Sequence, residues 1–135
     1  MKPRTIFLGR FLGLFTLIAS LWFLVERQAA LSDISELLAD RSAMLIFASI
    51  ALAGGLAIVL AHNIGSGGVL PVLVTLSGWV MLIRGVFFLL LSPDTSLMIL
   101  AFMQVERFFY IYFGIPFLLG VYLAYLGFTA HSRSA

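Results

Sequence analysis

Residues 69–92 read VLPVLVTLSGWVMLIRGVFFLLLS, and this stretch decides the class of fold. A helix needs roughly 20 mostly apolar residues to cross about 30 Å of hydrocarbon, and the stretch reaches that length with one charge, Arg84. A helix satisfies its own backbone hydrogen bonds inside lipid, whereas the alternating pattern of barrel strands is missing here. The stretch therefore predicts a transmembrane helix.

Three further segments have the same character, at residues 5–25, 43–61 and 108–130. The composition agrees, because 62% of the residues are hydrophobic and only 10% are charged, against about 25% charged in soluble domains. The first segment follows Met-Lys-Pro-Arg as a signal peptide would, but it is long and lacks a small-residue cleavage site, so we expect it to be retained. The sequence predicts an all-α, integral-membrane four-helix bundle forming a single domain over residues 1–135.

Two connections carry structure of their own. Asp33 and Glu36 have the spacing of a helix-capping box, and the apolar residues that follow share one face, which predicts a short interfacial helix over residues 33–40. Residues 97–107 are also apolar. They either extend the fourth span outward or lie along the membrane surface, and the sequence leaves both arrangements open.

The charges predict an orientation. Basic residues gather near the two ends of the chain, whereas the acidic residues all lie in the connections after the first and third spans. Cytoplasmic segments of membrane proteins are enriched in Lys and Arg, so we expect both termini in the cytoplasm. The basic residues near the ends are Lys2, Arg4, Arg10 and Arg133.

A shift of 69 residues aligns several positions of the two halves, among them Gly9 with Gly78 and His62 with His131. Tandem helical hairpins would produce such matches, and so would coincidence between apolar segments rich in Gly, Ala and Leu. Each span also has a stripe of small residues, which in the third includes Gly78 and Gly85. Such stripes predict close helix packing, within the bundle or in a homodimer.

Arg84 is the most informative polar residue, because it lies eight positions before Ser92, or about 12 Å along a helix. A charge at this depth costs roughly 2.5 to 3.5 kcal/mol unless it finds a partner. One interpretation is an anion or headgroup site that includes Glu26 or Glu106. The other, which we favour, is a structural ion pair or an arginine that extends to the membrane surface.

His62 and Asn63 end the second span, and His131 ends the fourth. Two histidines at one membrane face are compatible with a haem or metal site, but His62 is better explained as a residue that caps the helix. Trp79 is interpreted as a packing residue beside Gly78. The chain has no cysteine and no recognisable catalytic motif, so we expect neither a cofactor nor enzymatic activity, and its net charge of +2 gives no reason to expect nucleic-acid binding.

Two runs, GLAIVLAHN at residues 55–63 and LVTLSGWVMLIRG at residues 73–85, resemble a family of small bacterial integral membrane proteins. Those proteins have four predicted helices, His-Asn at the end of the second, and Gly-Trp and a basic-Gly pair in the third. The resemblance implies a multi-pass protein of the bacterial inner membrane, and it implies no activity. It draws attention to His62, Asn63, Trp79, Arg84 and Gly85.

The leading functional prediction is a non-enzymatic accessory or interaction component of the membrane, which binds other copies of itself or a different membrane protein. The first alternative is a small multimeric transporter or channel that uses Arg84 with Glu26 or Glu106. The second is a haem-binding or metal-binding bundle that uses His62 and His131.

Overall fold

The computed structural model describes residues 3–63 and 67–130, and every regular element in these residues is a helix. Four helices are long and apolar enough to cross a membrane: α1 (Pro3–Val25), α3 (Arg41–Ala61), α4 (Val69–Leu90) and α6 (Phe109–Thr129). Two shorter helices, α2 (Arg27–Ala39) and α5 (Pro93–Phe102), connect them. The predicted all-helical fold with four long apolar helices is confirmed.

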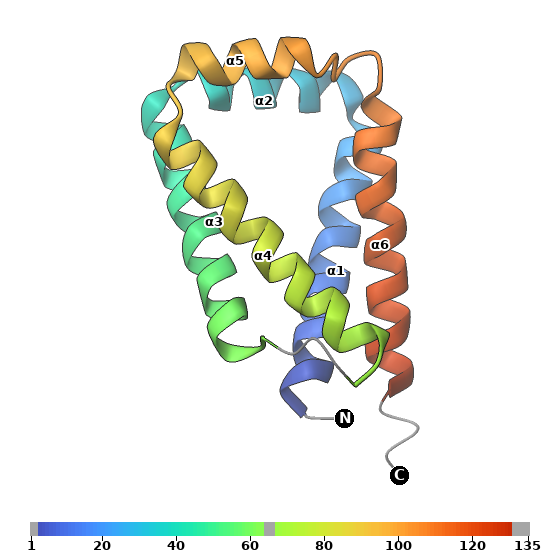
Figure 1. The fold of residues 1–135 in the computed structure, drawn as a ribbon. Coiled ribbons are helices and arrows are strands. Elements are labelled where there is room, and N and C mark those ends of the chain that lie inside the picture. Colours follow the sequence, from blue (N-terminus) through green and yellow to red (C-terminus); the bar gives the residue numbers. More distant parts are fainter. Residues whose placement is uncertain (1–2, 64–66, 131–135) are drawn as a thin grey trace.

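The short helices form a layer across one end of the molecule, and we call this end the α2–α5 layer (Figure 1). α1 and α4 run toward the layer, α3 and α6 run back from it, and α2 packs against α5 within it. α1 therefore begins, and α6 ends, at the opposite end of the molecule (Figure 1).

The long helices pack as two pairs, α1 with α6 and α3 with α4. The first span is thus paired with the last rather than with the second. α2 makes this possible, because a helix of 13 residues covers about 20 Å and carries the chain from one pair to the other. The pairs meet mainly near the end opposite the layer, where all four long helices contribute to one core cluster (Figure 1). Its members are Ile6, Leu12, Ile58, Leu70, Val74, Leu123 and Ala130.

Glycines bring the backbones of each pair into contact. A Cβ atom added to Gly120 of α6 would lie 2.6 Å from the amide nitrogen of Leu17 in α1. A Cβ atom on Gly85 of α4 would lie 2.5 Å from the amide nitrogen of Leu52 in α3. Membrane helices associate through such close packing, because lipid competes equally for ordinary apolar side chains. The helical glycines of each pair therefore mostly face the partner helix, whereas Gly9 of α1 faces Leu70 of α4 in the other pair.

The two pairs repeat one contact pattern. Gly13 of α1 opposes Ala124 of α6, and Gly55 of α3 opposes Leu82 of α4. A 69-residue shift converts one pair into the other, since it carries 13 to 82 and 55 to 124. Each half of the chain has a long, a short and a long helix in that order, and each pair takes one long helix from either half. In each half, the first long helix runs toward the α2–α5 layer and the second runs back from it (Figure 1). Each long helix therefore pairs with a helix from the other half.

The layer differs from the sequence expectation in one place, and in another it decides between two arrangements that the sequence left open. The helix predicted over residues 33–40 begins earlier, at Arg27, and its N-cap residue is Glu26. Residues 93–102 form a separate helix in the layer instead of extending α6. The Ser92 hydroxyl caps α5 by accepting a hydrogen bond of 3.3 Å from the amide of Thr95.

Arginines anchor the layer to the long helices. Arg41, at the start of α3, donates from its guanidinium to the carbonyls of Leu89 and Leu91 at the end of α4. Arg27 donates to the carbonyl of Glu106, just before α6, at 2.8 Å. Carbonyls at a helix C-terminus have no partner within the helix, so Arg41 both satisfies them and closes the α3–α4 pair.

Candidate functional site

Arg84 is exposed and lies in the second half of α4, the half nearest the α2–α5 layer (Figure 1). It precedes Leu90, the last residue of α4, by six positions, or about 9 Å of helix. In the described residues, its guanidinium makes no hydrogen bond and no ion pair. The structure thus leaves a full charge on a surface whose neighbours are apolar.

Glu26 and Glu106 lie together at the other side of the layer. Glu26 joins α1 to α2, Glu106 lies just before α6, and Arg27 links the two segments through the Glu106 carbonyl. Both carboxylates are exposed, and neither pairs with Arg84 in the part of the chain that the structure describes. The three residues considered as one polar site therefore do not form an intramolecular cluster.

An open apolar groove of about 490 Å³ runs along α4, and Arg84 is not among the residues that line it. Its walls come from the layer-proximal half of the helix. They are formed by Leu82, Ile83, Val86, Phe87, Leu90 and Leu91. Phe87 follows Arg84 by three positions, so the two side chains are neighbours on the helix surface. This groove could not be predicted from the sequence, because its residues resemble those of any lipid-facing helix.

The equivalent position in the other half has a different residue type. The 69-residue shift that relates the two pairs carries Arg84 to Phe15 of α1. Phe15 is 60% exposed and stacks on Phe11, with ring centroids 6.2 Å apart. The same surface of the fold is thus built with an aromatic ring in α1 and a guanidinium in α4.

Arg10 of α1 has the intramolecular partners that Arg84 lacks. Its Nε donates to the carbonyl of Gly127 at 3.0 Å, and its guanidinium lies 4.9 Å from the ring centre of Phe128. Gly127 permits this contact, because a Cβ atom there would lie 2.9 Å from the Arg10 amide nitrogen. Sequence reasoning placed Arg10 near the inner boundary but did not identify its contacts with α6.

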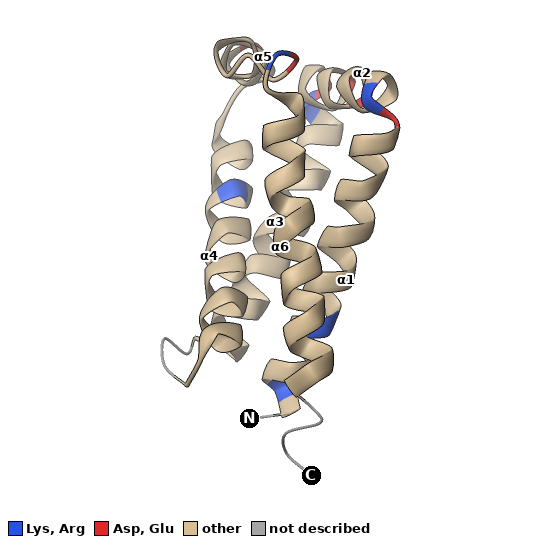
Figure 2. Cartoon of the chain, turned by 90° about the vertical axis from the view of Figure 1, so that its right-hand side faces the viewer, with Lys and Arg blue, Asp and Glu red and all other residues tan. Residues whose placement is uncertain are grey.

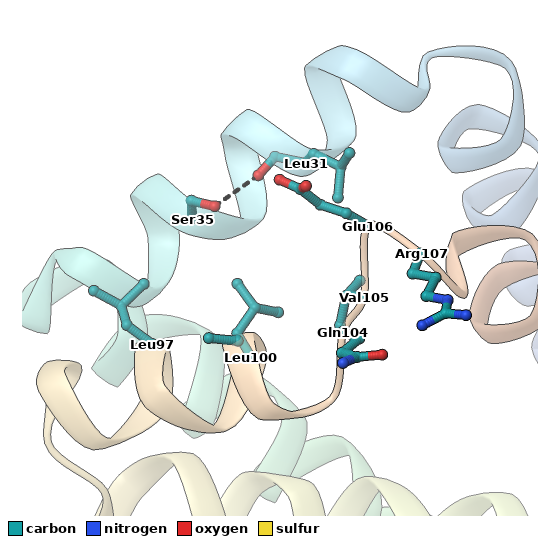
Figure 3. A pocket seen from close by; sticks show the side chains of 9 residues that line it. Leu31, Ser35, Leu97, Leu100, Gln104, Val105, Glu106 and Arg107 are labelled. Carbon is teal, nitrogen blue, oxygen red and sulfur yellow. Dashed lines mark hydrogen bonds between the residues drawn. The ribbon is translucent and has the colours of Figure 1, made fainter.

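A second groove, of about 500 Å³, opens between α2, α5 and the turn that follows α5 (Figure 3). Leu31 and Ser35 of α2 face Leu97 and Leu100 of α5 across it. Gln104, Val105, Glu106 and Arg107 supply the remaining wall with Ala101. The Glu106 carboxylate extends toward α2, whereas the Arg107 side chain points away from it (Figure 3). The groove combines leucine walls with a polar rim.

His62 ends α3 and is 2% exposed. Its backbone carbonyl accepts a hydrogen bond of 3.1 Å from the Thr75 hydroxyl of α4, and its Nε2 has no partner among the described residues. Asn63 beside it is exposed, and His131 lies outside the described residues. No group of three or more His, Cys, Asp or Glu side chains with metal-site geometry occurs in residues 3–63 and 67–130.

The three positions expected to pack in the third span differ in their surroundings. Gly78 lies against Ile58 of α3, and Gly85 lies against Leu52 of the same helix. Trp79 is 42% exposed, so its ring lies on the surface of the bundle instead of between the helices. Gly78 and Trp79 are consecutive, so they point in different directions around α4. Because Gly78 is on the face that packs against α3, Trp79 points away from that contact.

No known protein-family model, curated protein or solved structure matches this chain.

Proposed function

We propose that this chain is a non-enzymatic accessory or interaction component of the bacterial inner membrane. The observation that carries the proposal is the exposed guanidinium of Arg84, which has no intramolecular partner in the described residues. A membrane protein places an ionisable side chain within a span at a cost of several kcal/mol, and such residues mark functional contacts. An arginine that forms no hydrogen bond or ion pair within the described part of its own bundle is best explained by a contact with another molecule.

Charge distribution supports an orientation within this proposal. All six acidic residues lie in or beside the α2–α5 layer (Figure 2), where Arg27, Arg41 and Arg107 also lie, whereas Lys2, Arg4, Arg10 and Arg133 are near the two ends of the chain. By the positive-inside rule, the end at which α1 begins and α6 ends faces the cytoplasm, and the layer faces outward. The layer then lies at the outer membrane–water interface, where amphipathic helices are stable.

The test is extraction of the chain from its own membrane in native-lipid nanodiscs, followed by native mass spectrometry. We expect particles in which the 14.8 kDa chain occurs with a second polypeptide at a fixed stoichiometry. Reconstitution into liposomes provides the second measurement, in which we expect no flux of ions or small solutes. A chain that is recovered alone, with only lipid, contradicts the proposal, and so does an intrinsic flux that Arg84→Phe abolishes.

A further inference from the structure

We infer that the two halves of the chain are complementary binding partners, each of which docks on the other half and rejects a second copy of itself. The first half comprises α1–α3 (residues 3–63) and the second comprises α4–α6 (residues 67–130). The halves have the same order of helices, so two first halves or two second halves could adopt the observed arrangement with an exact two-fold axis. The glycines exclude these like pairs. The inference is independent of the proposed function.

The second half lacks the glycines that the first half contributes. A Cβ atom on Gly13 of α1 would lie 2.4 Å from the Ala124 amide nitrogen, and the 69-residue shift places Leu82 at the position of Gly13. A Cβ atom on Gly55 of α3 would lie 2.3 Å from the Leu82 amide nitrogen, and Ala124 occupies the position of Gly55. In a pair of second halves, Leu82 and Ala124 would therefore press a Cβ atom against the backbone of the facing helix.

The first half lacks the glycines that the second half contributes. A Cβ atom on Gly85 of α4 would lie 2.5 Å from an amide nitrogen of α3, and the equivalent residue of the first half is Thr16. A Cβ atom on Gly120 of α6 would lie 2.6 Å from an amide nitrogen of α1, and the equivalent residue is Ala51. A pair of first halves would therefore also have Cβ atoms where the backbones must touch.

The glycines are thus divided between the halves so that only the unlike pair has one at every close backbone contact. A like pair lacks a required glycine in the α1–α6 geometry and also in the α3–α4 geometry. Membrane helices associate through close packing, so a like pair loses the contacts that would hold it together. The same division explains why α1 pairs with α6 and not with α3 of its own half (Figure 1).

The experiment starts from the folded full chain. A protease site is inserted between Asn63 and Gly67, and the purified protein is cleaved in mixed micelles. Native mass spectrometry is performed after cleavage, and again after the halves have been dissociated in SDS and returned to mixed micelles. We expect a 1:1 complex of the two halves in both measurements. After reassembly, unlike pairs should exceed like pairs at least about tenfold, because each like pair has an overlap in both of its helix pairs.

The variant Ala124→Gly tests whether the glycines cause this preference. It gives the second half the glycine that it lacks in the α3–α4 geometry, and it preserves the native pair because Ala124 already faces Gly13. We expect pairs of second halves to rise toward the proportion of random association. Leu118→Gly, at an exposed position of α6, is the matched control and should leave like pairs rare.

Four results overturn the inference. They are halves that separate on cleavage, halves that stay apart while the uncut chain refolds under the same conditions, like pairs in the proportion of random association, and an equal effect of Ala124→Gly and Leu118→Gly. The last result would show that the flexibility of α6, and not the position of the glycine, determines the pairing. The unaltered halves provide the main measurement, so the outcome does not depend on the folding of a variant.

Discussion

Gly55 of α3 faces the backbone of Leu82 in α4 so closely that a Cβ atom on Gly55 would lie 2.7 Å from the Leu82 Cα. The equivalent contact in the other pair, Gly13 of α1 against Ala124 of α6, would place the added Cβ 2.8 Å from the Ala124 Cα. In both pairs the obstacle is backbone, which cannot move aside as a side chain can. The two pairs therefore depend on these glycines for their spacing.

Gly55→Ala should lower the free energy of unfolding by about 1–3 kcal/mol, because the added methyl group forces the α3–α4 backbones apart. The measurement is unfolding of the purified chain in mixed micelles. Gly54→Ala is the matched control, since its Cβ would meet only the end of the Met81 side chain at 3.0 Å. If the two variants were equally stable, backbone contact at Gly55 would not set the spacing.

Arg10→Met should lower the free energy of unfolding by about 1–2 kcal/mol, because it removes the hydrogen bond to the Gly127 carbonyl and the contact with the Phe128 ring. Arg84→Met is the matched comparison and should not lower stability, because Arg84 has no intramolecular partner in the described chain. Unfolding of both variants in mixed micelles gives the comparison. A larger loss at Arg84 than at Arg10 would show that Arg84 supports its own bundle.

Gln104→Gly should raise the free energy of unfolding by about 1 kcal/mol. Gln104 follows the end of α5 with φ of 48°, a left-handed conformation that costs residues with a Cβ atom and suits glycine. The same measurement on Met98→Gly, an exposed position inside α5, should show a loss of about 1 kcal/mol. Destabilisation by Gln104→Gly would mean that the glutamine side chain contributes more than its backbone conformation costs.

The orientation can be tested with single cysteines, because the chain has none of its own. We expect a membrane-impermeant maleimide to label Asp33→Cys in intact spheroplasts, because Asp33 is exposed in the layer that we propose to face outward. Asn63→Cys, exposed at the opposite end, should react only after lysis. The reverse pattern of labelling would place the layer in the cytoplasm and overturn the assigned orientation.

The positions of the long apolar helices could be predicted from the amino-acid sequence alone. The expected spans at 5–25, 43–61, 69–92 and 108–130 correspond to α1, α3, α4 and α6 within two residues at each end. The reason is that length and hydrophobicity are properties of each segment alone. A long apolar segment inside lipid satisfies its backbone hydrogen bonds by forming a helix. The matches at a 69-residue shift were also visible in the sequence, where coincidence was the favoured explanation.

The pairing of the helices, and the residues that face outward, could not be predicted without the packing of the helices against one another. A lipid-facing surface and a helix-facing surface are equally apolar, so periodicity does not separate them as it does in a soluble protein. Trp79 and Gly78 are adjacent in sequence, and the position of α3 alone determines that the glycine packs and the tryptophan is exposed. The same geometry leaves Arg84 exposed on α4, with no hydrogen bond or ion pair among the described residues.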